Sequence, residues 1–358
     1  MEFKRALIRL KKDVLGLLSA SYILLIALVA LFAYPISSDK TKFANQMHLS
    51  IHSKPPGFNC KMLIIPNSSE SSNSSFLWGD LNPNEEIPIE EIRWLDKSLT
   101  FKRMGNGTNH FEKILFSEFS TEMKRNQIEE NYIKEKVFYL GTDKYGRDLF
   151  SRLIIGSRIS ISIGFVAVFI SLILGVFFGS LAGFYGGMVD KLIIWFINVM
   201  WSIPTLLMVI AITIALGKGF WQVFVAVGLT MWVEVARLVR GLVKSRKEEV
   251  YIQAGEVLGF SKSRLLISHI IPTLAAPLIV ISATNFASAI LLESGLSFLG
   301  IGAQPPMPSW GGMVKDHFRY LLLGKAYLAI LPGFAIMSLV LAFMILGNSF
   351  RDALDARN

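Results

Sequence analysis

Long uncharged stretches divide most of this chain into segments that fit the apolar interior of a lipid bilayer. A bilayer core of about 30 Å requires about 20 largely apolar residues in a helix. The first such stretch runs from Val14 to Tyr34 without a charged residue. The whole pattern predicts six membrane-spanning helices, which lie within residues 14–34, 159–189, 192–217, 220–241, 265–292 and 326–350.

Small residues predict close helix packing in the second span, and one proline predicts a kink in the third. Gly175, Gly179 and Gly183 are spaced by four residues and therefore lie on one face of the second span, where they permit close approach of another helix. Pro204 interrupts the third span within Trp201-Ser202-Ile203-Pro204. Because proline lacks an N–H group, we expect a kink there, and the freed carbonyl makes Pro204 a candidate for a translocation path.

Glu293, near the end of the fifth span, is the second candidate for a translocation path. A carboxylate at membrane depth is costly and suggests either a pathway or a buried pair. The alternative is an interfacial residue that nearby backbone or Arg319 satisfies. Glu234 and Arg237 are three residues apart near the end of the fourth span, and this spacing favours a local ion pair.

Charge asymmetry predicts the orientation of the spans. Five basic residues precede the first span (Lys4, Arg5, Arg9, Lys11 and Lys12), and the positive-inside rule places them in the cytoplasm. Six spans then put the basic segment 242–274 and the C-terminus on the same side. A cleaved signal peptide has a similar basic start, but the apolar run ends at Tyr34-Pro35 without a small-residue cleavage site, which favours a retained helix.

Composition supports a membrane protein and excludes several other classes. Hydrophobic residues make up 52% of the 358 residues and charged residues 18%, against about 25% charged in an average soluble domain. The net charge of +9 follows from the predicted topology, so it indicates membrane lipid rather than nucleic acid as a partner. A single cysteine, Cys60, excludes an intrachain disulfide. No phosphate-binding loop and no H-E-x-x-H motif occur, so we expect no catalytic residue, no metal site and no bound cofactor.

Residues 36–140 differ from the rest of the chain. They are polar, with a Ser/Asn-rich stretch at 67–75 and mixed charge over 85–136, and they predict an extracytoplasmic insert with some helix near 117–137. The chain thus divides into residues 1–35, the insert 36–140 and a membrane domain 141–358. Charged residues alternate with apolar ones over residues 141–158, which predicts an amphipathic helix on the outer membrane face.

The predicted cytoplasmic segment, about residues 242–274, carries the most informative local pattern. Residues 248–258 suit a short helix, Gly259 suits its left-handed end, and Ser261 suits the cap of a second helix. The small residues Ala254 and Gly255 would allow another protein to approach the backbone of the first helix. A solvated basic loop without a partner is the simpler alternative.

The same segment resembles a motif of ABC importer permeases. QAGEVLG followed by HIIP is similar to the E-A-A-x-x-x-G-x9-I-x-L-P pattern, the EAA motif. The matching positions are Gln253, Ala254, Gly255, Gly259, Ile271 and Pro272, where Gln253 replaces Glu, Gly255 replaces Ala and Ile271 replaces Leu, while His269 replaces the motif's Ile.

Three further stretches resemble the C-type permeases of the dipeptide and oligopeptide importer family. They are GTDKYGRDLFSRLIIGSRISISIG at 141–164, ESGLSFLGIGAQPPMPSWGGM at 293–313 and GNSFRDALDAR at 347–357. The resemblance covers residue 141 to the C-terminus and the first helix. It implies an all-α polytopic membrane protein with six transmembrane helices of the type I ABC importer permease fold.

The resemblance also implies partners and a role. It implies a homologous partner permease, two cytoplasmic ATP-binding subunits that hold ATP and Mg, an extracytoplasmic solute-binding protein, and a multi-pass place in a bacterial or archaeal cytoplasmic membrane. The chain would be the non-catalytic permease of an importer for di- or oligopeptides. Its ATPase-docking coupling loop would comprise Tyr251, Gln253, Ala254, Gly255, Gly259, Ile271 and Pro272.

Two alternatives to a peptide importer stay open. An importer of the same architecture for another solute, such as nickel or an opine, would have the same motifs. An ion-coupled secondary transporter would work without ATPases, and it predicts midplane carboxylates or broken helices in paired repeats.

Overall fold

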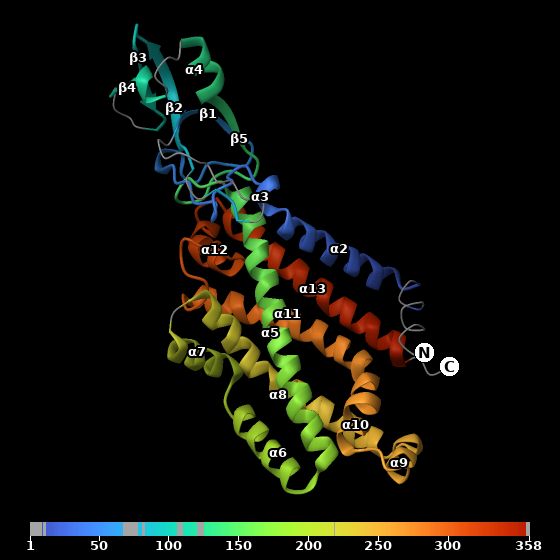
Figure 1. The fold of residues 1–358 in the computed structure, drawn as a ribbon. Helices are drawn as coiled ribbons and strands as arrows, with labels where there is room; N and C mark the ends of the chain where they lie inside the picture. The colour runs from blue at the N-terminus through green and yellow to red at the C-terminus, as the bar shows by residue number, and fades with distance from the viewer. Residues whose placement is uncertain are drawn as a thin grey trace.

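A bundle of long helices forms the body of the molecule, with a small β-sheet domain at one end and two short helices at the other (Figure 1). The computed structural model describes residue 9 and residues 12–66, 78–80, 83–105, 110–119, 125–217 and 219–355. The N-terminal end of α2 lies beside the C-terminal end of α13, opposite the sheet domain (Figure 1). Arg9 Nη1 donates to the Ala353 carbonyl at 3.3 Å, which joins the two ends directly.

The six-span prediction agrees with the helices of the bundle. Within the described residues, five helical segments are long and apolar enough to cross a membrane, and a bent helix pair gives a sixth span if it counts as one. The bounds are α2 (Val14–Leu31), α5 (Leu149–Tyr185), α6 (Gly187–Trp201) bent against α7 (Thr205–Leu216), α8 (Phe220–Lys247), α11 (Ala275–Leu299) and α13 (Tyr327–Asp355). Shorter helices are α3 (Ala33–Ile36), α9 (Val250–Val257), α10 (Lys262–Arg264) and α12 (Trp310–His317).

The predicted glycine face forms the contact between α5 and α8. A Cβ atom at Gly175 would lie 2.4 Å from Cβ of Val235, and one at Gly179 would lie 2.5 Å from the carbonyl oxygen of Ala236. Gly183 approaches the next turn of α8 in the same way. The two backbones therefore lie so close together that no side chain fits between them, which confirms the reason for the four-residue spacing.

The third span is broken at the predicted proline. α6 ends at Trp201 and α7 begins at Thr205, and the axes of the two helices meet at 93°. Pro204 has a φ of −54° and a ψ of 128°, an extended ψ that ends one helix before the next begins. The kink expected from the sequence is thus a sharp bend rather than a slight one.

The insert forms a five-stranded antiparallel sheet in the order β4-β3-β2-β1-β5. The strands are β1 (Phe58–Ile65), β2 (Glu85–Trp94), β3 (Ser98–Arg103), β4 (Glu112–Leu115) and β5 (Ile133–Phe138), and α4 (Arg125–Tyr132) packs on the sheet through the buried Ile128. Of the helix expected near residues 117–137, α4 covers 125–132 and strand β5 takes the C-terminal part, while residues 120–124 lie outside the described residues. The all-α description therefore holds for the membrane domain, to which the insert adds a sheet.

The segment before the second span differs from the amphipathic surface helix that the sequence predicts. Residues 141–148 form a tight loop, and α5 begins at Leu149 with Asp148 as its N-cap, whose carboxylate accepts from Ser151 N at 3.2 Å. Asp143, Arg147 and Arg152 are buried rather than exposed to headgroups. Arg147 and Arg152 both pair with the Asp143 carboxylate inside the protein, so amphipathic spacing is not the cause of the pattern.

Cys60 provides a test of the insert's fold. Its thiol lies in β1 against Met62, and burial raises its pKa to about 11. At pH 8 only about one thiol in a thousand is then a reactive thiolate. We expect iodoacetamide to label the native protein slowly and the urea-unfolded protein quickly, as followed by mass spectrometry. Rapid labelling of the native chain would contradict the burial of β1.

Candidate functional site

The loop between α8 and α11 has the local structure that the sequence predicts. α9 (Val250–Val257) is followed by Gly259 at a φ of +80°, a left-handed conformation that favours glycine. Phe260 N donates to the Gly255 carbonyl and Gly259 N to the Glu256 carbonyl, both at 3.0 Å. These two bonds form a Schellman motif, which ends α9 sharply. Ser261 then caps α10, since its hydroxyl accepts from Arg264 N at 3.3 Å.

One face of α9 packs on the chain itself. Ile252 is 2% exposed and joins an apolar cluster with Leu265, Val243 and other side chains of α5, α8 and the turn after α10. A Cβ atom at Gly255 would lie 2.8 Å from Leu265 Cδ2. Gly255 therefore serves packing within this chain, whereas the sequence analysis expected it to admit a partner's backbone.

The opposite face of α9 is apolar and exposed. Val250, Val257 and Leu258 are 80%, 88% and 75% exposed, and Tyr251 and Ala254 lie on the surface beside them. Apolar side chains so fully exposed at a bundle end are typical of a surface that another protein covers. Val250, Val257 and Leu258 are not part of the sequence motif, although their helical spacing relative to the buried Ile252 could have identified them.

α9 is held firmly at its base. Lys247 Nζ, at the end of α8, donates to the Phe184 carbonyl at 2.9 Å and lies 5.3 Å from the centre of the Phe184 ring. Ile271 and Pro272 form the start of a 3-10 turn that leads into α11, and Ile271 is half-buried. Gln253 is exposed, and its side-chain amide donates to the Glu248 carbonyl at 3.2 Å. The exposed face of α9 is thus presented on a packed base.

A pocket of about 480 Å³ lies at the bend between α6 and α7. Ile203 and Thr205 on either side of Pro204 line it, as does the exposed carboxylate of Glu234 on α8. The other lining residues come from α6, α7, α8 and α11 and are Met200, Trp201, Leu206, Met208, Thr230, Met231, Val233, Ser288, Leu291, Leu292 and Gly295. The pocket is open and mainly apolar, and the bend at Pro204 gives it its shape.

Glu293 is not among the residues that line this pocket. It is 1% exposed, and its Oε1 atom accepts from Ser297 Oγ at 2.6 Å. Ser297 Oγ also accepts from Ala303 N at 3.2 Å, so the Glu293 carboxylate helps to fix the loop that follows α11. The structure therefore does not bring the two sequence-predicted path residues, Glu293 and Pro204, together.

The local ion pair expected between Glu234 and Arg237 does not form. Arg237 Nη2 instead donates to Asn198 Oδ1 at 2.9 Å, and its guanidinium carbon lies 3.8 Å from the centre of the Trp201 ring. This arrangement ties α8 to the end of α6 and leaves the Glu234 carboxylate at the pocket. Arg237 thus contacts Asn198 and Trp201 of α6, which the fold brings near, rather than Glu234 on its own helix.

Comparison with known proteins gives a consistent family. The model of the family described as "Binding-protein-dependent transport system inner membrane component" matches residues 175–358. The dipeptide transport system permease protein DppC of Alkalihalophilus pseudofirmus is 40% identical over 219 residues, which cover 61% of this chain and 72% of that protein. The oligopeptide transport system permease protein OppC of Bacillus subtilis is 38% identical over 222 residues, with 62% and 72% covered.

The names of other similar proteins mention other transported solutes. The glutathione transport system permease protein GsiD of Pectobacterium atrosepticum is 37% identical over 219 residues, which cover 61% of this chain and 72% of that protein. Among solved structures, the MetNI methionine ABC transporter in an inward-facing conformation matches with a TM-score of 0.43 and 17% identity, over 56% of this chain and 96% of that one.

Proposed function

This chain belongs to the family of binding-protein-dependent transport system inner membrane components, and on that premise we propose that it is the permease through which an ATP-driven importer moves di- or oligopeptides. Peptide cargo is proposed because the named relatives include dipeptide and oligopeptide permeases. A homologous permease would supply the other half of the path, and a solute-binding protein would deliver the peptide. Two ATPase subunits would bind ATP and Mg and hydrolyse the ATP.

The exposed apolar face of α9 is the observation that carries this proposal. An ATPase must push on the membrane helices through a rigid element, because a flexible loop would absorb the movement. α9 meets that requirement, since its buried face packs on α8 and on Leu265 of the turn after α10, while Tyr251, Ala254 and Val257 remain free to contact a partner. We therefore assign α9 and the Gly259 turn as the coupling element, with Gln253 on its surface and Ile271-Pro272 at its base.

This assignment also orients the molecule. An ATPase that binds α9 lies in the cytoplasm, so both chain ends are cytoplasmic and the sheet domain is extracytoplasmic (Figure 1). The basic residues around α9, which include Lys244, Arg246 and Lys262, then lie on the side that the positive-inside rule favours. The pocket at Pro204 would form this chain's half of the translocation path.

A pull-down of tagged protein tests the role of α9. We expect Ala254→Arg to abolish recovery of the ATPase subunits, because it places a long charged side chain on the exposed face without entering the chain's own core. Gly259→Pro should do the same, since proline cannot adopt a φ of +80° and removes the N–H that bonds to Glu256. The readout is the ratio of ATPase to permease on the affinity resin.

The matched control is Asn59→Arg, which adds the same side chain to an exposed position of β1 at the opposite end of the molecule. It should recover as much ATPase as wild type. If wild type comes down without any ATPase, the ATP-driven mechanism fails. If Ala254→Arg recovers the normal amount, an ATPase binds elsewhere and α9 is not its docking element.

Uptake into proteoliposomes distinguishes the cargo classes. The assembled transporter should accumulate a labelled dipeptide when ATP and binding protein are present. Uptake of nickel or an opine, with no uptake of dipeptide, would instead support the importer of the same architecture for another solute.

A further inference from the structure

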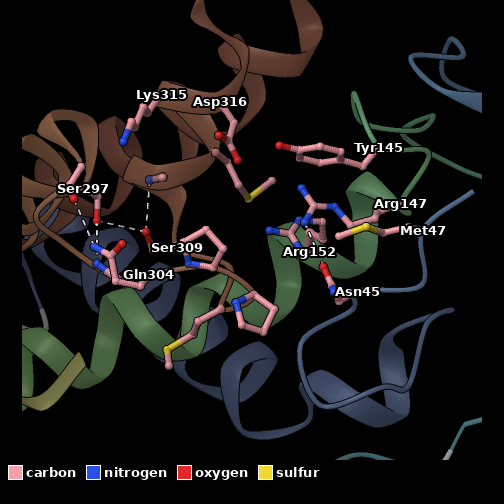
Figure 2. A pocket seen from close by; sticks show the side chains of 17 residues that line it. Asn45, Met47, Tyr145, Arg147, Arg152, Ser297, Gln304, Ser309, Lys315 and Asp316 are labelled. Carbon is pink, nitrogen blue, oxygen red and sulfur yellow. Dashed lines mark hydrogen bonds between the residues drawn. The ribbon is translucent and has the colours of Figure 1, made fainter. Parts of the chain in front are cut away.

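A second cavity, of about 420 Å³, lies where the sheet domain meets the membrane domain. Figure 2 shows its lining side chains, which converge from parts of the chain far apart in sequence. Asn45 and Met47 precede the sheet, Tyr145 and Arg147 lie in the loop before α5, and Arg152 lies in the first turn of α5. The end of α11, the loop after it and helix α12 close the other side with Ser297, Gln304, Ser309, Lys315 and Asp316, among others.

Two buried arginines are the main polar groups of this cavity. Arg147 is 3% exposed and Arg152 is 4% exposed. Both guanidinium groups lie at the cavity in Figure 2. They share one buried carboxylate, since Asp143 Oδ2 lies 2.6 Å from Arg147 Nε and 3.7 Å from Arg152 Nε.

The arginine side chains are held in fixed positions. Arg147 Nη1 donates to Asn45 Oδ1 at 2.9 Å, and its guanidinium carbon lies 4.5 Å from the centre of the Tyr145 ring. Arg152 Nη1 donates to the carbonyls of Phe43 and Ala44 at 3.4 Å and 3.3 Å. A ligand would therefore meet donors that are already oriented, with little further loss of side-chain freedom.

One nitrogen of each guanidinium has no hydrogen-bond partner among the described residues. These atoms are Arg147 Nη2 and Arg152 Nε, and both are buried. A buried charged donor without an acceptor is costly, so such a group requires an explanation. Asp143 Oδ2 is 3.7 Å from Arg152 Nε, too far for a hydrogen bond, so each guanidinium has a donor left for a carboxylate oxygen.

The charge of the cavity wall also favours an anion. Its cationic lining residues are Arg147, Arg152 and Lys315, and its one anionic lining residue, Asp316, already accepts from Lys144 Nζ at 3.0 Å. Asp143 does not line the cavity. It pairs with both arginines from behind the wall and offsets only one of their two charges, so the cavity keeps a net positive charge.

We propose that this cavity binds a carboxylate group through Arg147 and Arg152. The carboxylate comes from one of two sources, the C-terminus of a peptide or an acidic side chain of the docked solute-binding protein. Both sources rest on the proposed function, the first on its peptide cargo and the second on its binding protein. The cavity lies at the junction with the sheet domain, away from α9, where cargo and binding protein would arrive from outside.

Calorimetry on the purified transporter complex in lipid nanodiscs, without binding protein, tests the first source. The ligands are alanyl-alanine and its C-terminal amide, which lacks the carboxylate. Wild type should bind the free acid at least tenfold more tightly than the amide, about the effect of one charge-assisted hydrogen-bonded pair. Arg147→Lys should remove that difference, because an ammonium group keeps the charge but loses the planar fork.

Arg319→Lys is the matched control, since Arg319 is exposed and outside the cavity. It should keep the wild-type difference between acid and amide. Arg152→Lys is the second variant, with the same expected loss, in case Arg147→Lys fails to fold as judged by its thermal midpoint.

Titration of ligand-free binding protein tests the second source. If acid and amide bind wild type equally, but Arg147→Lys weakens docking of the binding protein at least tenfold, an acidic side chain occupies the cavity. If neither the peptide preference nor docking changes in either lysine variant, the carboxylate site does not exist. The peptide arm does not depend on ATPase docking, so its failure is distinguishable from failure of the α9 assignment.

Discussion

Gly179→Val is expected to lower the free energy of unfolding of the membrane domain by about 3 kcal/mol, the upper part of the usual range for overpacking. A Cβ atom at this position would lie 2.5 Å from the Ala236 carbonyl oxygen and 2.8 Å from Val239 Cβ. A backbone carbonyl cannot rotate away as a side chain can, so α5 and α8 would have to separate. Size-exclusion chromatography of heated, detergent-solubilised protein measures the resulting fall in thermal midpoint.

The control is Gly241→Val on α8, where a Cβ atom would meet nothing within 4 Å. It should change stability by no more than about 0.5 kcal/mol, as is usual for a surface position. Equal midpoints for the Gly179 variant and wild type would mean that α5 and α8 do not pack as closely as described.

The second large effect is expected for Asp143→Ala, which should lower the free energy of unfolding by about 3–5 kcal/mol. Asp143 is fully buried and is the carboxylate that Arg147 and Arg152 share. It also accepts from Tyr145 N at 2.8 Å and Arg147 N at 2.9 Å, which fixes the loop before α5. Alanine would leave two guanidinium groups facing each other without a counter-ion.

An exposed pair provides the comparison for this variant. Glu91→Ala also removes a carboxylate that pairs with an arginine, Arg93, but both side chains are at least half exposed. Such pairs contribute between about zero and 1 kcal/mol, so its thermal midpoint should change little. If the two variants lose the same small amount, Asp143 does not neutralise the buried arginines.

Local rules explain which elements the sequence could predict. The Gly175–Gly183 spacing, the left-handed Gly259, the Ser261 cap and the break at Pro204 each depend on residues within one or two helical turns. The sequence patterns did not predict the sheet of the insert, although β2 buries Ile87 and Ile89 within a run of glutamates. Its strands pair across residues far apart in the chain, and a polar, Ser/Asn-rich composition concealed that order.

In the candidate sites, too, local features could be predicted from the sequence and long-range contacts could not. The turn of α9 was predictable, but the buried role of Gly255 depends on Leu265, which reaches it only after the chain reverses at Gly259. Arg147 and Arg152 looked like an amphipathic pattern because their partners, Asn45 and the carbonyls of residues 43 and 44, lie about a hundred residues earlier. Spacing alone cannot reveal a contact of that range.

The length of α5 has a mechanical consequence. Its 37 residues extend about 55 Å at 1.5 Å per residue, well beyond a bilayer core of about 30 Å. It begins next to Arg147 and ends where the Phe184 carbonyl accepts from Lys247, close to α9, and it contains no proline. A tilt of about 5° about one end of such a rod moves the other end by about 5 Å. One unbroken helix thus connects the cavity of Arg147 and Arg152 to the base of α9, so a tilt at either end would move the other end without a chain of intermediate side chains.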